Sequence, residues 1–338
     1  MSATTVVIAK PMRRNWAFVE SPIFAPLVTQ AIIWILFLAF VPNFATMRTV
    51  SGIVGAASIN AVVVIGVTML MICGEFDLSV GAIMAMGGFI FGDILIAGGS
   101  PVVALIAALA VTTGMGAING LVTVTSGIPS FIVTLGTRSI FRAVVWIYSG
   151  GMMTQATQRF SVQEVVNGRL DIVNSLFTQA NFRTAVLWAL ALGIIFQFLL
   201  TRSSFGNRVF AVGGHPGAAR AQGVNTKRVK VMCFILTGVL AGFAGILTYS
   251  EFSTVLVVTG ANVELKVIAA AVIGGALLTG GSGSIVGGLL GILLINVLRS
   301  GIILMGFPSD NFDAIVGVTI IGAALINDWI VRRSALVA

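Results

Sequence analysis

The chain has 338 residues, of which 57% are apolar and 9% are charged, and its mean hydropathy is +1.07. A soluble domain of this length cannot bury so much apolar surface, so the composition predicts an integral membrane protein. The formal charge of +8 does not indicate nucleic-acid binding, because the basic residues fall mostly between apolar runs and do not gather on one face.

Apolar stretches of about twenty residues recur along the chain, which is the length that a helix needs to cross a bilayer. We count about ten of them, and they predict an all-α polytopic membrane protein that forms a single domain over residues 1–338. The expected spans are 23–42, 50–73, 79–98, 102–125, 130–149, 184–201, 231–250, 265–280, 285–304 and 313–331.

Two joints between these spans are very short. GEFDL (Gly74–Leu78) joins the second span to the third, and GGSGS (Gly280–Ser284) joins the eighth to the ninth. Each joint is expected either as a loop at the surface or as a re-entrant turn inside the protein. Because each half of the chain contains such a pair of helices, the pattern also suggests an inverted repeat, which is common in transporters.

The basic residues predict the orientation. An even number of spans places both termini on one side, and that side collects eleven of the nineteen Lys and Arg residues. We therefore expect the segments 1–22 and 202–230 in the cytoplasm, and the loop 152–183 outside, folded into short amphipathic pieces. The outer acids, expected as solvated groups or as contacts for a soluble partner, are Glu164, Asp171, Glu251 and Glu264.

Motifs that carry catalysis are absent from the sequence. It has no GxxxxGK[ST] loop to hold a nucleotide. One histidine (His215) and two separated cysteines (Cys73 and Cys233) fit neither the usual zinc sites nor a histidine-based triad. The sequence therefore predicts that the chain is not an enzyme and holds no metal or cofactor.

A short basic insert, Gly213–Lys230, separates two apolar segments. Pro216 suits the first turn of a helix, and Gly223 is a natural stop. Asn225 or Thr226 can cap the helix that follows. The capping signals predict a helix of about two turns, which needs support from the bundle or from a partner. It is expected either as an ordinary charged loop or as a docking helix.

Asp77 and Ser79 follow the first short joint. They are expected to cap the third span, because free N–H groups and the helix dipole satisfy an acid there. Alternatively, they line a route for a hydroxylated substrate. Glu75 is expected either as a solvated charge or as the partner of a buried arginine.

Arg138 and Arg142 lie four residues apart on one face of the fifth span. Arg138 is about 13 Å along that helix, close to the middle of the bilayer. An unpaired arginine facing lipid there is costly, so we expect Arg138 to face the bundle or water. The structural alternative is a pair with Asp93 or Glu75, or snorkelling of Arg142.

Four motifs, which span nearly the whole chain from the second helix on, carry a resemblance to a known family. They are GEFDLSVGA (Gly74–Ala82), GIPSFIVTLGT (Gly127–Thr137), TRSSFGNRVFAVGGHPGAARAQGV (Thr201–Val224) and IAAAVIGGALLTGGSGSIVGGLLG (Ile268–Gly291). In the same order, they resemble motifs of the ribose-type (simple sugar) ABC importer permeases of the branched-chain amino acid/ribose permease superfamily. The chain departs from the family at Glu75, His215 and Ser282, where the family has glycine, asparagine and arginine.

The resemblance implies a type II ABC importer-like permease bundle in the bacterial inner membrane, working as a homodimer with the pathway between the chains. It implies two further partners, a periplasmic sugar-binding protein and a cytoplasmic ATPase that binds the ATP. The residues expected in a coupling helix that enters a groove on the ATPase are His215, Pro216, Ala218, Ala219, Arg220 and Gly223. Those expected along the substrate pathway are Asp77, Ser79, Phe131, Thr134, Thr137 and Arg138.

Two questions stay open. The substrate can be a pentose, hexose or polyol, or a nucleoside or branched-chain amino acid as in relatives. The function can also belong to another class, an ion-coupled secondary transporter or channel that uses Asp77, Glu75 or Asp93 as its coupling carboxylate. A neighbouring ATPase and a secreted binding protein would favour the importer.

Overall fold

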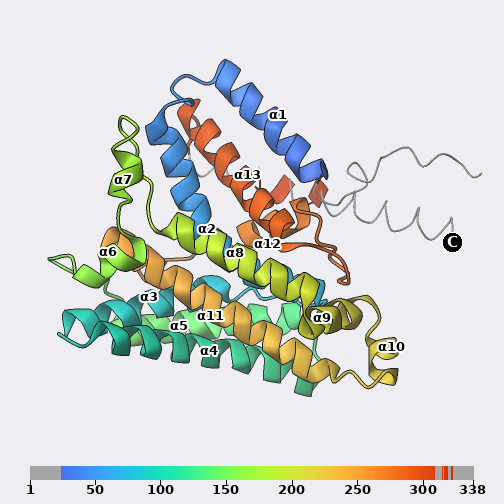
Figure 1. The fold of residues 1–338 in the computed structure, drawn as a ribbon. Coiled ribbons are helices and arrows are strands. Elements are labelled where there is room, and N and C mark those ends of the chain that lie inside the picture. The colour runs from blue at the N-terminus through green and yellow to red at the C-terminus, as the bar shows by residue number, and fades with distance from the viewer. Residues whose placement is uncertain (1–23, 309–313, 315, 319–320, 323–338) are drawn as a thin grey trace, which may run out of the picture.

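The computed structural model describes residues 24–308, 314, 316–318 and 321–322. These residues form a helical bundle (Figure 1). The longer helices are α1 (Phe24–Phe40), α2 (Met47–Ile72), α3 (Val80–Ile96), α4 (Pro101–Ser126), α5 (Ser130–Ser149), α8 (Ala185–Arg202), α11 (Thr226–Phe252) and α13 (Ile285–Leu304). The shorter elements are β1 (Thr154–Gln155), α6 (Ser161–Asn167), α7 (Asp171–Asn174), α9 (Ser204–Gly214), α10 (Pro216–Ala221), β2 (Thr254–Val255) and α12 (Val263–Ile273).

Six helices in the described part are long and apolar enough to cross a membrane, namely α2, α4, α5, α8, α11 and α13. The helices α1 and α3 are apolar but shorter, with 17 residues each. These eight helices match eight of the spans expected from the sequence. Most of the expected span 313–331 and the terminal basic residues lie outside the described residues, so the structure confirms a polytopic helical protein without fixing its number of spans.

The expected span 265–280 is wrong as a continuous helix. The helix α12 has 11 residues, and at 1.5 Å per residue it is about 16 Å long, half of a bilayer's apolar core. After Gly274 the chain turns through Gly275, Gly280 and Gly281, all with positive φ, before α13 begins. Glycine adopts this left-handed backbone without strain, so the GGSGS joint extends into the second half of the expected span.

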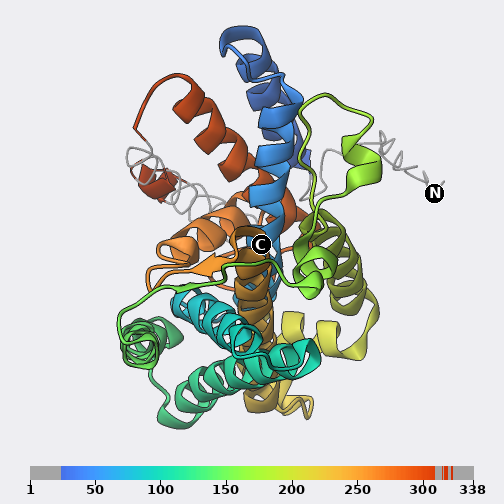
Figure 2. The ribbon, with the colours of Figure 1, turned by 90° about the vertical axis from the view of Figure 1, so that its left-hand side faces the viewer.

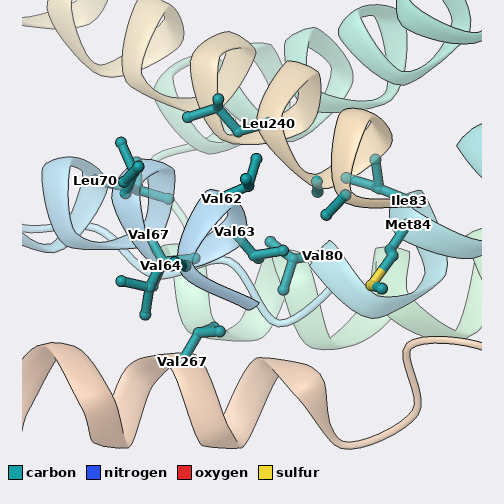
Figure 3. Packing of buried hydrophobic residues seen from close by; sticks show 14 of the residues in the cluster. Val62, Val63, Val64, Val67, Leu70, Val80, Ile83, Met84, Leu240 and Val267 are labelled. Carbon is teal, nitrogen blue, oxygen red and sulfur yellow. The ribbon is translucent and has the colours of Figure 1, made fainter. Parts of the chain in front are cut away.

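The core lies around α11, which packs against α2, α3 and α4. In Figure 3, Leu240 of α11 faces Val62 of α2, and Val267 of α12 lies on the opposite side of α2. Glycines bring the backbones together: a Cβ on Gly116 of α4 would lie 2.5 Å from the Phe234 carbonyl oxygen of α11. Such small-residue contacts let membrane helices pack closely without a hydrophobic driving force between them.

The helix α8 connects the two ends of the bundle. Its N-terminal end adjoins α6 and α7, and its C-terminal end leads into α9 and α10 (Figure 1). We call these the α6–α7 end and the α9–α10 end. With 18 residues, α8 is about 27 Å long, which is close to the thickness of a bilayer's apolar core.

The segment 152–183 stretches across the α6–α7 end (Figure 2). It contains the short helices expected there, and also β1, which pairs with β2 in antiparallel register (Thr154↔Val255). The pairing is a small correction to the all-α expectation. The segment is fixed to α11, because Asn167 Nδ2 donates to the Leu247 carbonyl oxygen at 3.0 Å and Arg183 pairs with Glu251 at 3.5 Å.

Candidate functional site

Asp77 lies in the joint between α2 and α3 and is fully buried. Its Oδ1 accepts hydrogen bonds from the backbone N of Ser79 at 2.7 Å and from Ser79 Oγ at 2.6 Å. Asn119 Nδ2 in α4 donates to both carboxylate oxygens, at 3.3 and 3.2 Å, and to Ser79 Oγ at 2.8 Å. The cluster ties the joint to α4 through neutral donors.

The capping interpretation is wrong for both side chains, because neither Asp77 nor Ser79 accepts a hydrogen bond from the first turn of α3. Ser79 is the N-cap residue of α3, but its side chain accepts no hydrogen bond from the first turn. Asp77 instead holds the N–H of Ser79 itself, which fixes the joint rather than the helix end. Burial within the joint raises the pKa of the Asp77 carboxyl, and the hydrogen bonds from Ser79 and Asn119 act against that rise.

Asn119 was not identified from the sequence. It is fully buried, and its Oδ1 has no hydrogen-bond partner among the described residues. The sequence feature that could have indicated its role is the amide side chain within a mostly apolar span, because burying an unpaired amide in a membrane helix costs free energy.

The N-terminal half of α5 is bound to the same joint. The backbone N of Phe76 donates to Ser130 Oγ at 3.0 Å, and Thr134 Oγ1 donates to the Phe76 carbonyl oxygen at 3.3 Å. Thr134 and Thr137 are buried, whereas the Phe131 side chain is exposed. The Thr134 hydroxyl is therefore hydrogen-bonded inside the chain, whereas the Phe131 side chain lies on the outer face of α5.

Arg138 shares the exposed side of α5 with Phe131, seven residues earlier. Its guanidinium pairs with Glu264 of α12 at 2.7 Å; the Arg138 side chain is 38% exposed and that of Glu264 is 1% exposed. The pairing confirms that Arg138 has a partner, but the partner is neither Asp93 nor Glu75. Asp93 instead accepts a hydrogen bond from Thr154 Oγ1 at 2.6 Å.

Arg142 strengthens the contact between α5 and the segment before α12. Its guanidinium donates to the carbonyl oxygens of Val257 and Thr259, the latter at 3.0 Å. Glycines close the space around Glu264, since a Cβ on Gly81 of α3 would overlap the Gly260 carbonyl oxygen and lie 2.7 Å from Glu264 Oε2. The joint, α3, α12 and the arginines of α5 thus form one connected unit.

Of the four acids expected on the outer side, Glu251 and Glu264 are used inside the chain. They pair with Arg183 and Arg138. Glu164 and Asp171 keep exposed side chains, 57% and 89%, although each lies near an arginine of its own loop. Only these two remain available as contacts for a soluble partner.

The helix α10 has the bounds that the capping signals predicted. It starts at Pro216, the turn that follows contains Gly223 with φ +81°, and Asn225 Oδ1 accepts from the backbone N of Arg228 at 3.0 Å. His215, Ala218 and Arg220 are exposed. Ala219 is not: it is 4% exposed and packs against the bundle, so the expectation that both alanines face a partner is wrong for Ala219.

Three backbones meet beside α10 in what we call the glycine junction, formed by Ile72–Gly74, Gly213 and Gly280–Gly281. The backbone N of Gly281 donates to the Ile72 carbonyl oxygen at 2.8 Å. A Cβ on Gly213 would overlap that oxygen and lie 2.7 Å from the Gly281 nitrogen. A Cβ on Gly280 would lie 2.8 Å from the Cα of Gly74. The segment leading into α10 is thus packed directly on both short joints.

Glu75 adds an ion pair to this region. Its carboxylate pairs with Lys230 in the first turns of α11, and the Glu75 side chain is only 9% exposed. The partner is therefore a lysine from the basic insert and not a buried arginine. Both acids of the first joint therefore have partners on other helices. Glu75 forms an ion pair with Lys230 of α11, and Asp77 accepts a hydrogen bond from Asn119 of α4.

These features define a class of protein: a polytopic helical membrane protein whose two broken-helix joints pack on Gly213, in the segment that leads into a short exposed helix between its spans. Comparison with known proteins agrees. The family model described as "Branched-chain amino acid transport system / permease component" matches residues 49–324, and the chain belongs to this family. Family membership assigns the chain to transport rather than to catalysis, as the sequence predicts.

Three relatives show the extent of the similarity. The chain is 30% identical to the ribose import permease protein RbsC of Escherichia coli strain K12 over 97% of its own length and 99% of the relative. It is 32% identical to the ribose import permease protein RbsC of Bacillus subtilis strain 168, over 85% and 86% of the two chains. It is 30% identical to the autoinducer 2 import system permease protein LsrC of Salmonella paratyphi B, over 84% and 80%. No solved structure matches the chain.

Proposed function

We propose that this chain is the membrane-spanning subunit of an ABC importer and moves a simple sugar into a bacterial cell. The relatives named as ribose import permeases support this substrate class, because similarity to one of them extends over nearly the whole chain. ATP would be bound by a separate cytoplasmic ATPase, and the sugar would arrive on a periplasmic binding protein.

The observation that carries the proposal is the contact of both joints with Gly213, at the end of α9 and just before α10. The exposed face of α10 offers His215, Ala218 and Arg220 to a partner. Directly before it, Gly213 packs on the Ile72 carbonyl oxygen and on Gly281. A displacement of α10 by the ATPase would therefore act on the α2–α3 and α12–α13 joints through backbone contacts, without side chains in between.

In this proposal the α9–α10 end is cytoplasmic, the α6–α7 end is periplasmic and the termini are cytoplasmic. Two copies of the chain would enclose the pathway. Phe131 and Arg138 support this arrangement, because a half-exposed arginine near mid-bilayer requires water or protein rather than lipid on its open side. Behind this face, Asp77 and Ser79 would hold the joint against α4. Thr134, with Thr137 buried one turn later, would tie α5 to the same joint.

The relative named as an autoinducer 2 import permease supports a second substrate within the same transport class. A nucleoside or a branched-chain amino acid remains a third alternative, the latter suggested by the family description. The ion-coupled alternative is less well supported, because both oxygens of Asp77 accept hydrogen bonds and Glu75 and Asp93 are engaged as well.

Reconstitution tests the function. Vesicles that contain the chain, its ATPase and its binding protein should accumulate labelled ribose or a related sugar only with ATP inside the compartment that holds the ATPase. Sugar accumulation by the chain alone under a proton or sodium gradient would overturn the importer and favour the ion-coupled transporter.

A further inference from the structure

Among the described residues, the α9–α10 end carries more basic side chains than acidic ones. The sequence has no Asp or Glu between Asp171 and Glu251, and Glu75 at this end is paired with Lys230. No ion pair within the described residues includes the remaining basic side chains here, which are Arg202, Arg208, Arg220, Lys227 and Arg228. This end of the chain therefore offers charge to an anionic partner.

Two of these arginines line the same cavity. It lies between α9 and the first turns of α11, has a volume of about 630 Å³, and is lined by Arg208 from α9 and Arg228 from α11. Gln222 provides an amide, and Phe205 and Met232 provide apolar surface. A cavity with two guanidinium groups, an amide and an apolar wall fits an amphiphilic anion better than a fully hydrated one.

Along α11, a basic residue is followed by an apolar one, in the same order as the headgroup and the acyl chains of a lipid in a bilayer. Arg228 lies in the first turn, and Met232 follows one turn later on the same face with 40% of its surface exposed. One turn of helix is about 5.4 Å, so the wall changes from cationic to apolar over the distance between a phosphate and the first acyl carbons. The helix then continues into the membrane-spanning part of α11.

We propose that this cavity binds the headgroup phosphate of an anionic phospholipid. The phosphate lies between the guanidinium groups of Arg208 and Arg228, the headgroup hydroxyls meet the Gln222 amide, and the start of the acyl chains lies against Phe205 and Met232. An acidic loop of the ATPase is the competing occupant, but it would have to reach the apolar wall at membrane depth. The lipid would hold α9 against α11, the two helices that precede and follow α10 in the chain.

The test measures lipid binding to the purified full-length chain by native mass spectrometry, with phosphatidylglycerol and phosphatidylcholine as probes. At about 1 kcal/mol for each basic residue, loss of both arginines should weaken phosphatidylglycerol binding roughly 30-fold, and loss of either one about fivefold. The variants are Arg208→Gln, Arg228→Gln and the double substitution. Arg202→Gln is the matched control, because it removes the same charge at the same end but does not line the cavity.

Each outcome decides the proposal. Selective loss of phosphatidylglycerol from the double variant, with Arg202→Gln at wild-type affinity, supports it. Equal losses in all variants would overturn it in favour of diffuse attraction, and glycerol phosphate binding as tightly as the lipid would overturn it in favour of a free phosphate site. Unchanged lipid binding together with lost ATPase co-purification would assign the cavity to the ATPase. None of these outcomes depends on which substrate the chain transports.

Discussion

Gly213 and Ile72 belong to different helices, yet no side chain fits between them: a Cβ on Gly213 would overlap the Ile72 carbonyl oxygen, the same oxygen that accepts the N–H of Gly281. The contact joins the end of α2, the end of α9 and the turn before α13. Because all these atoms are backbone, a larger residue cannot be accommodated by rotating a side chain.

Gly213→Ala should therefore separate α9 from the two joints. We expect it to lower the unfolding temperature of the purified chain and to reduce ATP-driven transport at least tenfold at equal membrane levels. Gly114→Ala is the control, since a Cβ there meets nothing within 4 Å in α4. Wild-type transport by Gly213→Ala would show that the glycine junction does not transmit motion.

The two alanines of α10 should respond differently to a large side chain. Ala218 is exposed, so Ala218→Trp should leave the chain folded but prevent ATPase co-purification. Ala219 is 4% exposed, so Ala219→Trp should overpack the bundle and destabilise the chain itself by about 1–3 kcal/mol. Thermal unfolding of each variant separates the two effects, and equal behaviour of both variants would contradict the placement of α10.

Arg220 is expected to act through charge. Arg220→Glu should weaken assembly with the ATPase, and the difference from wild type should shrink as salt increases, because exposed charges are screened. Co-purification at low and high ionic strength measures this. A deficit that does not change with salt would point to packing instead.

The Arg138–Glu264 pair should contribute to stability through α12. Glu264→Gln removes the charge that faces Arg138, and we expect a loss of roughly 1–3 kcal/mol in the free energy of unfolding. Glu164→Gln is the matched control, because Glu164 forms an exposed ion pair that contributes little. Denaturant unfolding in detergent should show the loss only for Glu264→Gln. Equal stability of the two variants would contradict a structural role for the ion pair at the buried Glu264.

Asn119→Ala should release Asp77 from α4. The buried carboxylate then loses the donor that reaches both of its oxygens, at a cost of about 1–3 kcal/mol. Thr125→Ala, an exposed position on the same helix, should change little. Faster proteolysis or hydrogen exchange of the 73–79 joint in Asn119→Ala alone would locate the effect, and its absence would contradict the anchoring role.

The proposed topology can be checked by labelling without removing the native thiols, because Cys73 and Cys233 are buried. Ile172→Cys in α7, at a position that is 85% exposed, should react with an impermeant reagent added outside the cell. Asn207→Cys in α9 should react only after the membrane is opened. Reaction of both from the same side would overturn the assignment of the two ends.

Local signals predicted the eight longer helices and the bounds of α10, because spans, caps and glycine stops depend on neighbours within a few residues. They did not predict α9, and they made α12 too long. They did not predict Asn119 as the partner of Asp77 or Glu264 as the partner of Arg138, since each pair joins distant parts of the chain. The difference between Ala218 and Ala219 was equally hidden: identical side chains in a six-residue helix give no hydrophobic pattern. Contacts between glycines of distant segments also produce no periodic pattern in the sequence, so they could not be predicted from it.

The glycine junction also limits how the chain can be recombined with its relatives. Where side chains separate two helices, a change on one helix can be compensated by a smaller or larger residue on the other. At Gly213 there is nothing to resize, because the neighbours are the Ile72 carbonyl and the Gly281 nitrogen. A hybrid that takes its α9–α10 segment from one permease should thus work only when residues 72–74 and 280–281 come from the same parent.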